Sequence, residues 1–201
     1  MDMQKTIDTL RAEGFAVSHF ATGAEAADYL CSAIHDTTVG FGGSQSVKDL
    51  NLIERLGERN TVFAHGITPG EADAVRRQAN ASEVYIASVN GLAETGELIN
   101  IDGCGNRVSA LLYGPKRVYF VVGQNKIAPD FASALHRARN IAGPLNARRL
   151  NKKTPCALGK EVRCYDCKSP ERICRGFTVT NRPLTGFESM EVVLIDEDLG
   201  Y

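Results

Sequence analysis

The chain has 201 residues, of which 43% are hydrophobic and 23% are charged, and its formal net charge at pH 7 is −1. These values are typical of one globular domain with a sizeable core, or of one domain with a small appendage. A charge so close to zero creates no overall field that attracts nucleic acid or an anionic membrane, so we expect neither as a partner.

The N-terminal segment indicates the compartment. No apolar run is long enough to span a bilayer, and the polar, helix-like start MDMQKTIDTLRAEG lacks the apolar core of a signal peptide. We therefore expect a cytoplasmic protein. Because the cytosol keeps thiols reduced, disulfide bonds are the weaker interpretation of the cysteines that gather near the C-terminus.

Helical and strand patterns alternate from the first residues onward. Thr22 and Glu25 form a predicted capping box, after which apolar residues follow a helical period up to Ile34. The apolar segment 39–41 predicts a strand, and the apolar stripe within 47–56 predicts the next helix.

The following elements continue the pattern. Apolar segments at 61–64 and 84–87 predict strands, and between them Thr68 and Glu71 form a second predicted capping box with Pro69 at the first helical position. The strand segments are continuously apolar, as expected of strands covered on both faces. This alternation predicts an α/β domain with a mainly parallel sheet flanked by helices.

One segment departs from the alternation. Residues 97–101 and 107–111 are β-prone, and residues 102–106, Asp-Gly-Cys-Gly-Asn, are rich in turn formers. We expect a hairpin here, which makes the sheet mixed.

The last part of the chain changes character. A strand at 118–122 and a helix over 131–141, which we expect Gly143-Pro144 to end, complete the main domain. Cysteine, lysine, arginine and proline then dominate until Met190 begins a last strand. The predicted organisation is an α/β domain, a Cys-rich loop segment packed on it and a returning strand, at residues 1–150, 151–190 and 191–201 respectively.

Polar residues follow several predicted strands at their carboxyl ends, where open α/β sheets bind ligands. Residues 42–46, Gly-Gly-Ser-Gln-Ser, lead into a helix. Glycines admit a ligand close to the backbone, and a helix N-terminus favours an anion. Asn90 and Lys126 follow two other strands, and Lys126 is the expected countercharge of a small anionic or phosphorylated ligand. A plain turn and cap is the alternative for the loop, and His65 is a candidate base or a structural residue.

The predicted hairpin is denser in polar groups than a turn requires. Carboxylates there can serve in acid–base chemistry, and a glutamate can attack an activated acyl group. Asp102 and Asn106 are also common turn formers, so Glu94 is the better catalytic candidate. The candidate catalytic residues are Glu94, Asp102 and Lys126. The candidate ligand-binding residues are Gly42, Gly43, Ser44, Ser46, Asn90, Asn106 and Arg107.

Four of the six cysteines lie within one short stretch, TPCALGKEVRCYDCKSPERIC. Their spacing, Cys156-x7-Cys164-x2-Cys167-x6-Cys174, is typical of thiolate metal ligands, and both zinc and a [4Fe–4S] cluster use four of them. Nearby lysines and arginines would offset the thiolate charge, and a metal would supply folding energy that this segment otherwise lacks. Free thiols or disulfides are the alternative.

Four stretches of the chain resemble a known family. They are VGFGGSQSV, ASVNGLAETGELINIDGCGNRVSALLYGPKRVYFVVGQNKI, RNIAGPLNARRLNKKTPC and CYDCKSPERIC, and the second is the most specific because it matches as a long run. Together they resemble the LUD-domain proteins, named for lactate utilization, from about Val39 to the C-terminal LIDEDLGY. The compact members with a C-terminal cysteine segment are most similar, although the loop 157–163 is longer here.

The resemblance implies a fold similar to the NagB/RpiA/CoA-transferase-like group. Relatives in that group bind sugar phosphates, acyl-CoA or folate with ATP, often through a Gly-Ser-rich loop, and residues 42–46 stand in the matching place. Some family members are linked to the oxidation of lactate to pyruvate alongside iron–sulfur subunits. No catalytic residue set follows from the resemblance.

Three functional hypotheses result. The first is an accessory or catalytic component of lactate-type organic-acid oxidation, which binds a small anionic substrate and a metal at the four cysteines. The second is an acyl- or phosphate-transferring enzyme that acts through Glu94 and the loop at 42–46. The third is a non-enzymatic assembly subunit of an iron–sulfur redox complex. The sequence leaves open whether the protein is an enzyme and whether it forms an oligomer.

Overall fold

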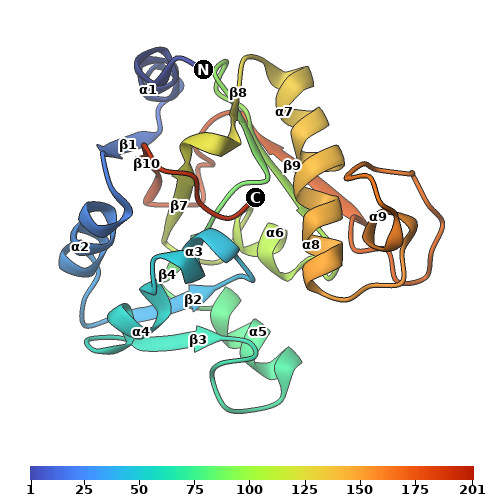
Figure 1. The fold of residues 1–201 in the computed structure, drawn as a ribbon. Helices are drawn as coiled ribbons and strands as arrows, with labels where there is room; N and C mark the ends of the chain where they lie inside the picture. The colour runs from blue at the N-terminus through green and yellow to red at the C-terminus, as the bar shows by residue number, and fades with distance from the viewer.

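The computed structural model describes all residues, 1–201, and its centre is a six-stranded sheet in which every paired strand is parallel (Figure 1). The strand order is β1-β10-β7-β4-β2-β3. The predicted α/β class with a mainly parallel sheet is thus confirmed, and all five apolar segments lie in its strands. The strands are β1 (Ala16–Phe20), β2 (Thr38–Phe41), β3 (Thr61–Ala64), β4 (Val84–Ala87), β7 (Arg117–Gly123) and β10 (Ser189–Ile195).

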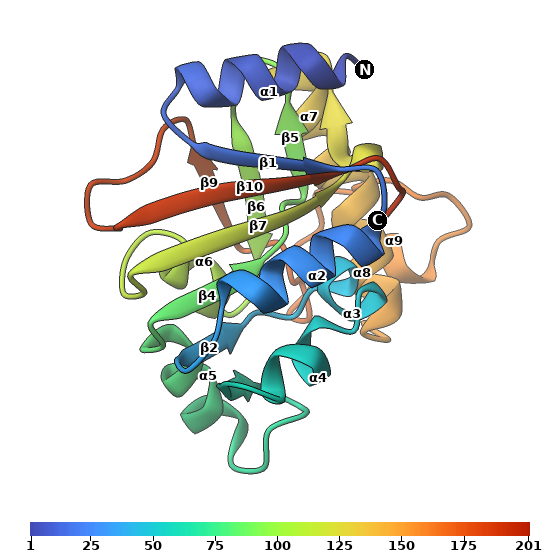
Figure 2. The same ribbon diagram turned by 90° about the vertical axis from the view of Figure 1, so that its left-hand side faces the viewer.

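Helices and a second sheet cover the two faces of this sheet (Figure 2). Tyr119 and Val121 of β7 pack into one apolar cluster with α2, α3 and α4, whereas Phe120 and Val122 pack into another with α1, α6 and the second sheet. This alternation explains why the central strands are apolar at every position. The helices are α1 (Met3–Ala12), α2 (Gly23–Ala33), α3 (Gln45–Asp49), α4 (Leu52–Gly57), α5 (Ala72–Asn80) and α6 (Asn106–Ala110).

The second sheet has four strands in the order β8-β5-β6-β9 and is mixed. Its strands run across those of the first sheet in Figure 2. Gly91 of β5 lies directly under α7, where an added Cβ would come within 2.5 Å of the Ala134 carbonyl oxygen. The strands are β5 (Gly91–Ala93), β6 (Leu98–Asp102), β8 (Ile127–Ala128) and β9 (Gly176–Thr180).

The predicted hairpin is wrong in its second strand. The antiparallel partners of β6 are β5, which precedes it, and β9, near the C-terminus, whereas residues 106–110 form helix α6. The Asp102 carboxylate explains the difference, because it accepts hydrogen bonds from the backbone N–H groups of Cys104, Gly105, Arg107 and Val108. These bonds satisfy the free donors at the start of a helix, so the turn residues begin α6.

Two predicted helix boundaries also differ. The helix predicted to end at Gly143 continues through a π-helical turn, Ala138–Ala142, into α8, and there the Gly143 N–H bonds the carbonyl five residues back. The extra residue of the π turn accommodates Pro144, which has no N–H to donate. Likewise, α5 begins after Glu71, whose carboxylate caps it, whereas the Thr68 hydroxyl bonds Val62 and Ala64. The bounds are α7 (Phe131–Arg137) and α8 (Gly143–Arg149).

The stripe within 47–56 divides into α3 and α4 at Asn51, whose φ is +51°. The capping box of Thr22 and Glu25 is confirmed at the start of α2.

The C-terminal residues join both sheets. After α8 the chain forms the short helix α9 (Pro155–Leu158) and an irregular loop on the outer side of α8, then β9 at the edge of the second sheet (Figure 1). The last strand, β10, lies between the edge strand β1 and β7 in the first sheet. None of the helices has both the length and the apolar character that crossing a bilayer requires.

Candidate functional site

A small polar pocket lies where the carboxyl ends of β2, β4 and β7 meet, as expected for an open α/β sheet. Its volume is about 40 Å³, which is space for a few water-sized groups. α6, α8 and the C-terminal residue complete its wall, and Figure 1 shows the C-terminus between α3 and α8. The lining includes Gly43, Ser44, Ser88, Asn90, Arg107, Lys126, Asn146 and Tyr201.

Lys126 is the buried cation of this pocket. It lies in a 3-10 turn, Gln124–Lys126, directly after β7, and it is 4% exposed. Its Nζ donates hydrogen bonds to Ser46 Oγ at 2.7 Å and to Ser88 Oγ at 2.9 Å, and it forms no salt bridge. Burial first, and then the charges of Arg137 and Arg107, lower the pKa of Lys126 to about 7. The amine therefore changes charge near neutral pH.

Arg107 supplies a second cation without a direct counterion. Its guanidinium donates to the Ser88 carbonyl at 3.0 Å, the Asn100 side-chain oxygen at 2.7 Å, the Asn90 side-chain oxygen at 2.8 Å and the Ile101 carbonyl at 2.6 Å. All four acceptors are neutral. Desolvation lowers the pKa of Arg107. The guanidinium thus joins the loop after β4 to β6 and leaves positive charge at the pocket.

Arg137 of α7 adds a third positive charge behind these loops. It donates to the backbone carbonyls of Asn125 at 2.7 Å and Asn90 at 2.8 Å, and burial lowers its pKa to about 10. Its contacts hold the loops after β4 and β7 in place. Two basic side chains therefore line this small polar space and a third lies behind its wall, an arrangement that favours an anion.

The C-terminal tail closes the pocket from the side of α3. Ser46 Oγ donates to the Leu199 carbonyl at 3.2 Å, and the Gly200 N–H donates to the Asp49 carboxylate at 2.8 Å. Tyr201 lines the pocket, and its hydroxyl is buried without a hydrogen-bond partner. Burial raises the pKa of this hydroxyl.

The structure brings five of the predicted residues to this pocket: Gly43, Ser44, Asn90, Arg107 and Lys126. A sixth, Ser46, reaches it by bonding Lys126. Gly42 has another role than the expected ligand contact. An added Cβ would lie 2.9 Å from Arg107 Cδ and 3.0 Å from the Tyr85 hydroxyl oxygen, so glycine leaves room for the arginine side chain.

The remaining predicted residues lie outside the pocket lining. Glu94 follows β5 and holds the N-terminus, because its carboxylate accepts from the Asp2 N–H at 2.8 Å and from Lys5 Nζ at 3.3 Å. The Asp2 hydrogen bond, and then Lys5, lower the pKa of Glu94. Asp102 caps α6, and the Asn106 carbonyl accepts a hydrogen bond from the Asn80 side chain.

Several lining residues were not among the candidate site residues. Ser88 follows directly on β4, so its position at a strand end was an available signal. Asn146 and Tyr201 carried no local signal, because only the packing of α8 and of the C-terminal tail brings them here. The same holds for Arg137, which lies behind the pocket.

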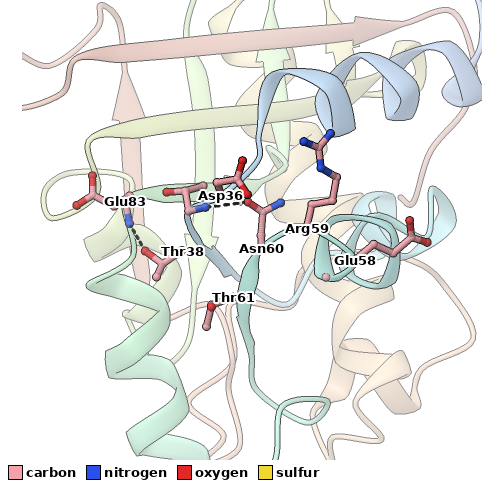
Figure 3. Close-up of a pocket in the computed structure, with 9 residues that line it drawn as sticks. Asp36, Thr38, Glu58, Arg59, Asn60, Thr61 and Glu83 are labelled. Carbon is pink, nitrogen blue, oxygen red and sulfur yellow. Dashed lines mark hydrogen bonds between the residues drawn. The ribbon is translucent and has the colours of Figure 1, made fainter.

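A larger hollow of about 660 Å³ lies at the opposite, amino-terminal ends of β2 and β3 (Figure 3). Polar groups that line this hollow form hydrogen bonds with neighbouring residues of the protein. The Thr38 hydroxyl accepts from the Glu83 N–H at 2.9 Å, and the Asn60 side-chain oxygen accepts from the Thr37 N–H at 3.1 Å. The larger hollow contains no buried charged group, so the smaller pocket at the carboxyl ends of the strands is the better candidate site.

The four clustered cysteines line one small cavity beside α8, together with Gly143, Pro144 and Ala147 of that helix. All six cysteines of the chain are free thiols. No group of three or more histidine, cysteine, aspartate or glutamate side chains is arranged closely enough to hold a metal ion. The fold therefore gathers these thiols around one space without bringing their sulfurs to coordination distance.

Comparisons with known proteins agree on the fold. The LUD domain family matches residues 3–195. A DUF162 family protein from Deinococcus radiodurans has a similar structure, with a TM-score of 0.54 and 12% sequence identity over 96% of this chain and 95% of that one. At this identity the likeness supports the fold alone. No curated protein matches the sequence.

Proposed function

Since this chain belongs to the LUD-domain family, a family related to lactate utilization, we propose that it binds a small organic-acid anion of the lactate type at the strand-end pocket. In this proposal the protein is a component of organic-acid oxidation. The observation that carries it is the buried amine of Lys126, which has two serine hydroxyls as partners and no carboxylate. A buried cation without a countercharge is costly unless a ligand supplies one.

The size and charge of the pocket support this ligand class. Its volume of about 40 Å³ suits a molecule with few heavy atoms, such as a 2-hydroxy or 2-oxo acid. A carboxylate would meet Lys126 and Arg107, and the Ser44, Ser88 and Asn90 side chains offer hydrogen bonds to a hydroxyl or keto oxygen. The same positive charges repel a metal cation, so this pocket is no metal site.

The pKa of Lys126, about 7, supports a chemical role as well as a binding role. Oxidation of a 2-hydroxy acid releases the hydroxyl proton and transfers two electrons with the C–H hydrogen to an acceptor. The protonated amine that binds the carboxylate cannot accept this proton, so the base would be the minor, neutral form of Lys126 in the complex, and its fraction rises with pH. The hydride would pass to a two-electron acceptor held by a separate redox partner. An iron–sulfur subunit, the partner class that the lactate-type assignment suggests, would carry the electrons onward one at a time.

No observation favours the transfer alternative. Glu94 engages Asp2 and Lys5 and lies outside the pocket lining, so it faces no ligand bound beside Lys126. An assembly subunit without a ligand would have no need of unpaired buried cations. Binding of a small acid is therefore the function that the geometry supports best.

Calorimetry tests the proposal with L-lactate, pyruvate, inorganic phosphate and CoA as ligands. We expect lactate or pyruvate to bind at millimolar concentration or below, and Lys126→Met to abolish the heat while keeping a similar side-chain volume. Lys116→Met is the matched control, because Lys116 is exposed, pairs with Glu83 at 2.7 Å and lies at the opposite end of β7 from Lys126. Absence of binding to the wild type, or unchanged binding by Lys126→Met, contradicts the proposal. Tighter binding of CoA than of the small acids supports the transferase class instead.

A further inference from the structure

The cysteine cavity carries an inference that is independent of the anion pocket. We propose that Cys156, Cys164, Cys167 and Cys174 bind one thiophilic divalent metal ion, of which Zn²⁺ is the expected example. The four residues come from α9, the irregular loop after it and the residue pair before β9, yet all line the same cavity. Convergence of four thiols from three places along the chain is what a tetrahedral thiolate site requires.

The turn of the Cys-x2-Cys pair orients its first sulfur. The Asp166 N–H donates to Cys164 Sγ at 3.3 Å, which orients the first sulfur from within the turn. Asp166 has a φ of +43°, an unusual conformation for a residue other than glycine. Its carboxylate oxygen Oδ1 lies 3.4 Å from an Arg139 nitrogen and 3.3 Å from an Arg172 nitrogen, which hold the turn in this strained form.

Two further sulfurs have polar partners that suit thiolates. Arg172 Nε donates to Cys174 Sγ at 3.2 Å. The Thr154 hydroxyl lies 3.3 Å from Cys156 Sγ. Hydrogen bonds of this kind stabilise and orient metal-bound thiolates from outside the ligand set.

The charge of the segment matches that of a tetrathiolate centre. Residues 151–175 contain seven basic and three acidic residues, a net charge of +4. Metal binding replaces four thiol protons by one divalent ion, so the centre itself carries a charge of −2. The surrounding arginines and lysines offset that charge, whereas neutral thiols would leave the basic residues to repel one another.

The cysteine segment, residues 155–175, is held by hydrogen bonds and not by a packed apolar core. None of the side chains from residue 155 to residue 175 is buried, so apolar packing contributes little to its order. Arginine side chains instead bond its carbonyls: Arg148 donates to Gly159 at 2.7 Å and to Glu161 at 3.0 Å, and Arg172 donates to Cys167 at 2.8 Å. A bound metal would supply the missing stabilisation, as it does in other small loop-rich segments.

The size of the cavity distinguishes the two metal classes that the cysteine spacing allows. Its volume is about 20 Å³, which is space for about one water-sized group and hence for one ion. A four-iron cluster needs a much larger space. Because the sulfurs are not yet at coordination distance, the loop must contract around the ion. The residues that would move, 155–175, have no buried side chain, so contraction shifts the loop without moving side chains of the core.

The test is metal content and cobalt substitution on the full chain, purified without oxygen. We expect about one zinc per chain, and after replacement by Co²⁺ we expect the intense visible absorption of tetrahedral cobalt with a thiolate-to-cobalt band. Cys164→Ser and Cys174→Ser should each lose most of the metal and this spectrum. Cys104→Ser is the matched control and should keep both, because Cys104 is exposed and lies outside the cavity.

Three results overturn the proposal: metal-free protein with four reactive thiols that binds no added Zn²⁺, protein in which these cysteines form disulfides, and brown protein with several irons per chain. If the serine variants unfold, the cobalt spectrum of the wild type still decides the outcome. Lactate and pyruvate binding, measured on the same preparations, reports on the anion pocket separately. Failure of one proposal is therefore distinguishable from failure of the other.

Discussion

The pH dependence of anion binding is the most direct test of the Lys126 site. The free protein has a Lys126 pKa of about 7, lowered mainly by burial. A bound carboxylate supplies the missing countercharge and raises this pKa, so the anion binds the protonated amine and takes up a proton at higher pH. The affinity should therefore be greatest below pH 7 and fall as the pH rises.

The magnitude follows from the fraction of protonated amine. This fraction is about 0.9 at pH 6 and about 0.01 at pH 9 for a group with a pKa of about 7. If the bound amine stays protonated up to pH 9, the dissociation constant rises about 90-fold between pH 6 and pH 9, or about 2.7 kcal/mol. Lactate and pyruvate keep a constant charge in this range, because their carboxyl groups are already ionised.

Calorimetry in buffers of different ionisation enthalpy measures both quantities. Proton uptake on binding should be about 0.1 at pH 6 and about 0.9 at pH 8. Burial lowers the pKa of the nearby His65, which moves its titration toward the acidic end of the window, and burial raises that of Tyr201 above the window. An affinity that is constant between pH 6 and pH 9, or the same pH profile in Lys126→Met, would refute the reasoning.

Three further predictions concern residues around the two sites. Gly42→Ala should displace Arg107, weaken lactate or pyruvate binding at least about tenfold and lower the free energy of unfolding by about 1–3 kcal/mol. Calorimetry measures the binding and urea unfolding measures the stability. Gly57→Ala is the control and should change neither, because its added Cβ lies 3.9 Å from the nearest atom. Glu94→Gln should leave anion binding unchanged but lower the free energy of unfolding by about 1–3 kcal/mol at pH 7. Because the pKa of Glu94 is lowered in the folded protein, this difference in stability should disappear as the pH falls below the ordinary glutamate pKa. A loss of binding without a loss of stability would show that Glu94 belongs to the anion site. Arg148→Met should loosen the loop after α9 and weaken Zn²⁺ binding in a competition assay with a coloured chelator, and unchanged affinity would show that this arginine does not organise the cysteine cavity.

The elements that could be predicted are those whose signal is local. The strands β2, β3, β4, β7 and β10 are short apolar runs because helices or the second sheet cover both of their faces. The capping box at the start of α2 depends on two residues three positions apart, so it was also visible. β1 was missed because it is an edge strand without a buried residue, which leaves no continuous apolar run.

The incorrectly predicted segments share one cause. Their residues are compatible with several local structures, and contacts with residues distant in the sequence select one of them. Asp102 and Gly105 favour turns in general, and here they begin a helix whose arginine reaches back to β6 and the loop after β4. Pro144 usually ends a helix, and here a π turn admits it. Local propensity therefore predicted a strand after Gly105 and a helix end at Gly143, whereas tertiary contacts decided both structures.

By itself the sequence determined the α/β class, the family resemblance and the positions at strand ends where ligand-binding residues gather, because parallel strands place their carboxyl ends at one edge of the sheet. Only the tertiary structure decided which of those residues share a pocket. It bonded Glu94 to the N-terminal residues, placed the C-terminal Tyr201 beside Lys126 in one pocket, and buried the lysine deeply enough to lower its pKa to about 7. It likewise placed four cysteines around a cavity of about 20 Å³. Burial, distance and cavity size arise when separate segments pack together, so no single stretch of sequence contains them.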